Sequence, residues 1–463
     1  MSLSTSASNK LRAEGNTYYA SGKAVGLAPC VALSRFEKAL QLYRKAAEAA
    51  CCEEERSSAF KNSALASWRA ALLDIGPIGH QDPREIYHWS NALENFHKAK
   101  LSGHVCDRQG RVEWVDTLLK SLQECFFNLR SACFELDYDN RVEFILKIQQ
   151  HSLPQDACIW GPLQGMLCGI KYNESVLKRE EGCYRDAIIN VRSAMQDIAI
   201  FVEHRRRHGH YPMVCDLNYE DDELERQARQ QERICEAMQA CAIGDKVLEK
   251  SLMDEETTNF LMVWEAVDHY HTALLLARDQ EVEEEAKACS RLAKTFNRVL
   301  MLQEKAEFYA KHAMELAESL MPRNLHDEVW FKDASVVLDK IRSVRQRQEE
   351  ALLDEEMKKY KEELKDELAA LEDLVYRGKY PRKGKEATYQ EILRYIYEKH
   401  PQIRESGYKL PEKFGYDLLK STFRKALVHY HPDKVDREED GMKWYTLCTE
   451  ICKVLSRIYE TLK

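Results

Sequence analysis

Glycine and proline are scarce in this chain of 463 residues, which contains 18 and 11 of them. These residues supply the turns between short strands, so their scarcity argues against an all-β fold and predicts long helices. No uninterrupted apolar run approaches the roughly 20 residues that span a bilayer. The first ten residues also lack the apolar core of a secretory signal. We therefore expect no membrane insertion and a cytoplasmic location.

Motifs of enzymes and of metal sites are missing as well. The 15 cysteines are scattered and include no Cys-x-x-Cys pair, which favours buried reduced thiols over a zinc site or a disulfide framework. The sequence contains no phosphate-binding glycine loop, nucleophile elbow or paired-metal motif. We expect a protein that is not an enzyme and that needs no cofactor and no metal ion.

An excess of positive charge is also absent. Lys and Arg number 68 against 77 for Asp and Glu, which gives a net charge of −9 and indicates neither nucleic acid nor an anionic membrane as a partner. One basic run, His204 to His210, precedes acidic residues Glu220 to Glu225. A site for nucleic acid or an acidic tail is conceivable there, but we interpret the run as a loop between helices.

The most informative feature is the tripeptide His431-Pro432-Asp433 and the stretch before it. Apolar residues between Leu418 and Tyr430 recur near helical spacing, and cations fall largely on other faces. Pro432 cannot continue a helix, so we expect the tripeptide to form an exposed turn. A second helix is predicted after it. The apolar positions are Leu418, Leu419, Phe423, Leu427 and Val428 in the first helix and Trp444, Leu447, Ile451, Leu455 and Ile458 in the second.

The stretch from Lys420 to Lys434 resembles helix II and the following loop of a J-domain, the DnaJ module. That module docks on chaperone ATPases of the heat shock protein 70 family and stimulates their ATP hydrolysis. The resemblance implies that residues 386–463 form a J-domain and that its tripeptide triggers hydrolysis. It also implies a basic face that meets an acidic surface of the ATPase, which favours encounter rate and specificity. The implied docking residues are His431, Pro432, Asp433, Lys420, Arg424, Lys425 and Lys434.

The C-terminal region also departs from the J-domain pattern. The nearest equivalent of helix I, around Tyr389, is separated from helix II by a longer loop than usual. A lysine common before the tripeptide is replaced by His429, and Cys452 and Val454 stand near the usual Ala-Tyr pair of helix III. These differences leave a second hypothesis open, in which an adaptor keeps a J-like domain that no longer stimulates an ATPase.

Metal binding is an alternative interpretation of the same residues. His429-x-His431-x-Asp433 is similar to the start of a motif that binds metal in metallo-hydrolases. A zinc site needs at least three well-placed ligands, and Lys434 stands where that motif has its final histidine. The run also follows a predicted helix rather than a strand, so we favour the J-domain loop.

Five stretches match the pattern Ala-x-x-x-(bulky or Ala)-x-x-Ala of second helices in tetratricopeptide repeats. Small alanines let paired helices approach closely. Residues 1–150 and 151–340 therefore resemble two parts of a divergent tetratricopeptide-like array, which implies an all-α fold and a surface for a client or partner protein. A generic helical bundle with alanines in its core is the alternative. The matches are Ala39/Tyr43/Ala46, Ala92/Phe96/Ala99, Ala187/Val191/Ala194, Ala266/Tyr270/Ala273 and Ala306/Ala310/Ala313.

The first unit contains a possible carboxylate clamp. The segment around Arg12 and Asn16 resembles the start of the repeat subset that holds a chaperone's C-terminal carboxylates, and Asn62 lies in a similar segment of the second unit. Cations and amide donors bind carboxylates by charge-assisted hydrogen bonds. Cations of a third unit cannot be assigned, because Lys120 is off the pattern, and the alternative is that all three are ordinary helix-surface residues.

Between the repeats and the J-domain, residues 341–385 predict a charged helical linker and a hinge. Glu and Lys alternate in a way that favours an exposed helix, and Leu364, Leu368, Leu371 and Val375 form a short apolar stripe. We expect this stripe to pack on the last repeat. The combined hypothesis is a co-chaperone whose repeats bind a client while its J-domain recruits the ATPase.

Overall fold

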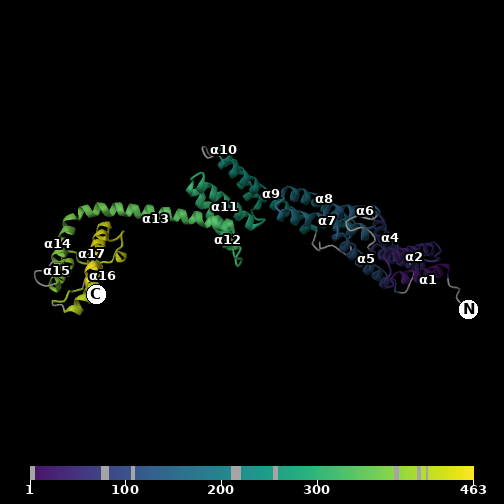
Figure 1. Ribbon diagram of the computed structural model, residues 1–463, viewed down its shortest axis with the longest axis horizontal. Coiled ribbons are helices and arrows are strands. Elements are labelled where there is room, and N and C mark those ends of the chain that lie inside the picture. The colour runs from purple at the N-terminus through teal and green to yellow at the C-terminus, as the bar shows by residue number, and fades with distance from the viewer. Residues whose placement is uncertain are drawn as a thin grey trace. The chain divides into compact units, whose positions relative to one another are not determined.

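The protein is all-helical in the part of the chain that the computed structural model describes. This part comprises residues 6–73, 83–105, 110–209, 221–253, 259–379, 385–403, 408–412 and 415–462. Within it lie seventeen α-helices, one 3₁₀ turn and no strand (Figure 1). The predicted all-α fold class is therefore confirmed. The chain divides into two compact units, Met1–Val337 and Leu338–Lys463, and the finer divisions at residues 150 and 385 stay predictions.

Successive helices of the first unit pair as antiparallel hairpins (Figure 1). Two further helices, α5 (Arg111–Phe134) and α6 (Tyr138–Gln149), lie in the chain between the second and third hairpins. The hairpins are α1 (Ala7–Gly22) with α2 (Pro29–Glu48), α3 (Glu53–Ala71) with α4 (Pro83–Val105), α7 (Ala157–Glu180) with α8 (Tyr184–His208), α9 (Asp221–Leu252) with α10 (Phe260–Ala277), and α11 (Val282–Arg298) with α12 (Gln303–Ser319).

Each of the five alanine patterns lies in the second helix of one of these hairpins. All fifteen residues of the patterns are buried, and every alanine among them has no exposed surface. Burial of alanines is expected for a repeat array and for a bundle alike, but one pattern in each of five consecutive hairpins is what an array predicts. The alanines therefore set the close approach of the paired helices.

A glycine and a tyrosine fix the packing of the first hairpin. Gly15 in α1 faces Tyr43 in α2 so closely that an added Cβ would lie 2.6 Å from the tyrosine Cε1. The Tyr43 hydroxyl donates to Asn16 Oδ1 at 2.8 Å, which satisfies the polar end of a buried ring. Burial raises the pKa of Tyr43 well above its usual range.

The fourth hairpin repeats this arrangement in α9 and α10. A Cβ on Gly244 would lie 2.7 Å from Tyr270 Cε1, and the Tyr270 hydroxyl donates to Asp245 Oδ1 at 2.8 Å. Arg291 in α11 also donates to Asp245, at 2.9 Å, and so links this hairpin to the next. The same contact between a glycine and a buried tyrosine occurs in two hairpins, and this supports an internal repeat.

We expect Gly244→Ala to lower the thermal midpoint of the chain and Gly169→Ala to raise it. Alanine at position 244 would press on a buried ring, and such overpacking costs about 1–3 kcal/mol. A methyl group added to Gly169 in α7 would meet no neighbouring atom within 4 Å, so alanine there gains about 1 kcal/mol of helix propensity. Circular dichroism melting of both variants checks the opposite signs. Equal shifts would contradict the packing of Gly244.

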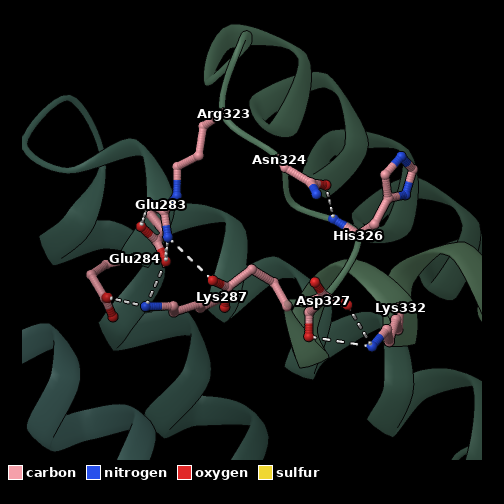
Figure 2. A network of polar contacts seen from close by, with 9 residues as sticks. Glu283, Glu284, Lys287, Arg323, Asn324, His326, Asp327 and Lys332 are labelled. Atoms are coloured by element: carbon pink, nitrogen blue, oxygen red, sulfur yellow. Dashed lines mark hydrogen bonds and ion pairs between the residues drawn. The ribbon is translucent and has the colours of Figure 1, made fainter.

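A network of ion pairs holds the segment between α12 and α13 (Val329–Glu363) against α11. Glu283 lies between Arg323, at 2.5 Å, and Lys287, at 3.1 Å (Figure 2). Lys287 also pairs with Glu284 at 2.7 Å and Arg323 with Glu328 at 3.2 Å. Burial alone would raise the pKa of Glu283, but the hydrogen bonds from Arg323 and Lys287 lower it. Each of the two cations pairs with two carboxylates, so we assign this network a structural role.

The second unit has its own core. After α13 follow α14 (Lys365–Lys379), α15 (Lys385–Lys399), α16 (Tyr416–His429), the 3₁₀ turn η1 (Pro432–Lys434) and α17 (Met442–Thr461). Buried apolar side chains of α14 to α17 form one cluster. Helix α13 begins in the first unit, where Trp330 is buried and its carbonyl accepts a hydrogen bond from the Ser290 hydroxyl at 2.6 Å.

The expected packing of the α14 stripe on the last repeat is wrong. Leu364 and Leu371 are each 2% exposed and belong to the core of the second unit, where Leu368 and Val375 pack against them. Near the start of this stripe, Lys361 forms an ion pair with Glu450 of α17 at 2.7 Å. The stripe requires an apolar partner, and helical periodicity alone does not say which of two neighbouring units supplies it.

Candidate partner-docking surface

Helix α16 presents a buried face and a basic face. Leu419, Phe423 and Ala426 are buried and anchor the helix in the second unit. Leu418 and Val428, which belong to the predicted apolar pattern, are instead 44% and 46% exposed. They are on the outer side because their positions are rotated from Phe423 by more than a quarter turn.

Three of the predicted basic residues, Lys420, Arg424 and Lys425, lie on this outer side, and Lys434 lies in the turn after the helix. Arg424, Lys425 and Lys434 are exposed and Lys420 is half-buried. Among the described residues, none of these four cations pairs with a carboxylate, whereas Lys425 lies 5.6 Å from the ring centroid of Tyr408. With exposed apolar side chains between them, these cations form a surface that can meet an acidic partner with an apolar centre. We call the four cations with Leu418 and Val428 the basic face.

The predicted turn follows α16 and contributes Lys434 to the basic face. Helix α16 ends at His429, and His431 caps the 3₁₀ turn that Pro432 begins. The His431 Nδ1 atom accepts a hydrogen bond from the Asp433 amide at 3.3 Å, and the side chains of His431 and Asp433 are 48% and 86% exposed. The tripeptide is thus an ordered, exposed turn, as its proline predicts.

The two residues before the turn, His429 and Tyr430, are fixed by hydrogen bonds to other segments of the second unit. The Tyr430 ring is fully buried, and its hydroxyl donates to the His400 carbonyl at 2.6 Å. Tyr397 hydrogen-bonds His429 Nδ1 at 2.7 Å, and the Tyr408 ring packs edge-on against His429 at 5.1 Å. His429 therefore takes part in an aromatic cluster. In the described part of the chain, no three His, Cys, Asp or Glu side chains gather as a metal site requires, so the metal hypothesis gains no geometric support.

Sequence reasoning missed a cavity behind the turn. It has a volume of about 220 Å³, and both Gln402 amide atoms are buried without a hydrogen-bond partner in the part of the chain that the structure describes. Native proteins rarely leave such atoms unpaired. No motif marks this site, because its residues come from three separate segments. The lining residues are Gln402, Ile403, His429, Lys434, Val435, Asp440 and Trp444.

The proposed carboxylate clamp is assembled only in part. Asn62 of α3 donates to Asn16 Oδ1 of α1 at 3.1 Å, so the two amides lie together as predicted. Arg12 bonds instead to Asn9 on its own helix, and Lys120 is an exposed residue of α5. A clamp that binds a doubly charged terminus requires more donors than one cation and two amides.

The basic run at His204 is not the predicted loop. Helix α8 continues through it to His208, and both His204 and Arg205 are buried. His204 hydrogen-bonds the Pro154 carbonyl at 2.8 Å and stacks near Trp160 at 4.5 Å. This end of the run is therefore part of the packing of the first unit, whereas His210 and Glu220 lie outside the described residues.

Comparison with protein-family models and with curated protein sequences finds no match for this chain. Within the described ranges, no helix is both long and apolar enough to cross a membrane.

Proposed function

We propose that this protein is a co-chaperone that recruits a heat shock protein 70 family ATPase and stimulates its ATP hydrolysis. The observation that carries the proposal is the exposed His431-Pro432-Asp433 turn placed directly after a basic helix. In this proposal residues 386–463 act as a J-domain, and the helices of the first unit bind a client or partner. The protein supplies no catalytic group of its own, because the ATPase contains the hydrolytic site.

The electrostatics of α16 support this proposal. The whole chain carries a net charge of −9, yet Arg424, Lys425 and Lys434 are exposed without carboxylate partners among the described residues. Unpaired cations on an otherwise acidic chain direct an acidic partner to one place, and such steering raises association rates by about 10–1,000-fold.

Single-turnover ATP hydrolysis tests the proposal. The full chain should accelerate hydrolysis by a cytosolic heat shock 70-kDa chaperone about tenfold, a barrier change of about 1.4 kcal/mol. His431→Gln should return the rate to the unstimulated value, since this side chain is exposed and caps only a three-residue turn. The control is His326→Gln, which changes an exposed histidine of the first unit.

The second candidate function is an adaptor that binds an ATPase without stimulating it. The aromatic cluster of Tyr397, Tyr408 and His429 favours this candidate, because it replaces the lysine usual before the tripeptide with a side chain held by a tyrosine. Binding of the folded chain to several such chaperones without any acceleration would establish the adaptor and refute the co-chaperone.

A further inference from the structure

Three side chains of the first unit line up between α4 and α7. His97 Nδ1 of α4 lies 3.2 Å from Cys158 Sγ in the first turn of α7. The other ring nitrogen, His97 Nε2, lies 2.9 Å from Asp156 Oδ1 at the start of the same helix. A thiol, an imidazole and a carboxylate in this order are the arrangement by which a base activates a nucleophile.

The Asp156 side chain contacts the His97 imidazole and does not cap its own helix. It occupies the N-cap of α7, where aspartate ordinarily accepts a backbone hydrogen bond, but its side chain makes no such bond. The carboxylate can only accept, so His97 Nε2 carries the proton and Nδ1 keeps its lone pair. The hydrogen bond from one ring nitrogen thus fixes the tautomer that leaves the other able to take the thiol proton.

Burial outweighs the nearby charges and favours a neutral thiol and a neutral imidazole. Burial raises the pKa of Cys158, Asp156 adds to the rise, and Lys100 opposes both. Burial lowers the pKa of His97, as does Lys100, against the opposite effects of Asp156 and Glu94. A neutral thiol beside a neutral imidazole matches general-base activation, in which the proton moves only when an electrophile arrives.

Access to the trio selects a very small reaction partner. Cys158 is 6% exposed, so very little of this residue is in contact with solvent. Burial to this degree excludes peptide, acyl and nucleotide substrates, whereas hydrogen peroxide is only slightly larger than water.

We propose that Cys158 is a peroxide-reactive thiol, activated by His97 and oriented through Asp156. His97 takes the thiol proton as the sulfur attacks one peroxide oxygen. The O–O bond breaks, the sulfur becomes a sulfenic acid, and the departing hydroxide takes the proton from His97 to form water. Thiol and peroxide thus yield sulfenic acid and water, with sulfur oxidised and peroxide reduced.

Site-resolved oxidation of the reduced full chain tests this proposal. The chain is exposed to hydrogen peroxide near neutral pH, catalase removes the oxidant, and unfolding with a sulfenic-acid trap labels oxidised cysteines for mass spectrometry. Cys241 is the internal control, because it is buried to 5% exposure and makes no imidazole contact among the described residues. We expect Cys158 to be oxidised at least about 100-fold faster than Cys241, which is the lower end of the usual range for a general base.

Two variants distinguish activation of the Cys158 thiol from a purely structural role of His97 and Asp156. His97→Gln should lower the rate at Cys158 to that of Cys241, and Asp156→Asn should lower it partially while leaving both other side chains in place. Rates at the exposed Cys30 and Cys183 should not change in folded variants. If Cys158 of the unaltered chain reacts no faster than Cys241, the proposal is overturned and the trio only fastens α4 to α7.

Discussion

Replacing both Leu364 and Leu371 with Asp is expected to unfold the second unit while leaving the first folded. Both leucines are 2% exposed and pack in one cluster with the helices that carry the docking surface. Losing one buried leucine costs about 2–5 kcal/mol, and a buried, unpaired carboxylate adds to that cost. The sum exceeds about 5 kcal/mol, which is the whole stability of many domains.

Hydrogen exchange measured by mass spectrometry checks this expectation segment by segment. Amides of α15 to α17 should lose protection in the double variant, whereas those of α1 to α4 should keep it. Leu352→Asp is the matched control, because Leu352 is a leucine of α13 that is 63% exposed. Full protection of α15 to α17 in the double variant would mean that α14 is not part of their core.

The same packing bears on any isolated C-terminal fragment. A fragment beginning at Lys379 starts within the linker and hinge predicted from the sequence. It therefore omits Leu364 and Leu371. Its buried side chains Ile392, Leu393 and Ile396 would then lose apolar neighbours from α14. Functional tests therefore need the full chain or a fragment that includes α14.

The sequence predicted the helices of the docking surface because periodicity and proline are local signals. The predicted second helix corresponds to α17, and its residues Leu447, Ile451, Leu455 and Ile458 are all buried. The exposed turn at Pro432 follows from the missing amide proton of proline. These features depend on residues within one or two turns of each other, so a single sequence contains them.

Apart from the Asn16–Asn62 contact, the contacts between distant residues were not predicted. His97 and Cys158 are separated by 61 positions, and neither belongs to a motif that would associate them. Asp245 and Tyr270 form a pair only because α9 and α10 fold back on each other. Sequence periodicity identifies which face of a helix is apolar, but the partner of that face is decided by tertiary packing.

The strongest effect on function is expected from charge reversal on the basic face. Lys420→Glu together with Arg424→Glu should raise the half-saturating concentration of the chain in the single-turnover assay about 100-fold at low salt, because steering becomes repulsion. Neither residue packs in the core: Arg424 is exposed and Lys420 half-buried. The maximal stimulation at saturation should survive, since the tripeptide is unchanged.

This outcome distinguishes binding from triggering. His431→Gln should abolish stimulation at every concentration, whereas the charge-reversed chain should recover it at high concentration. Added salt should shrink the difference between the charge-reversed and unaltered chains, because charges are screened beyond about 8 Å at physiological ionic strength. The control pair, Lys399→Glu with Arg457→Glu, makes the same change in net charge at exposed positions on α15 and α17. Equal weakening by the control pair would show that net charge, and not the basic face of α16, governs the encounter.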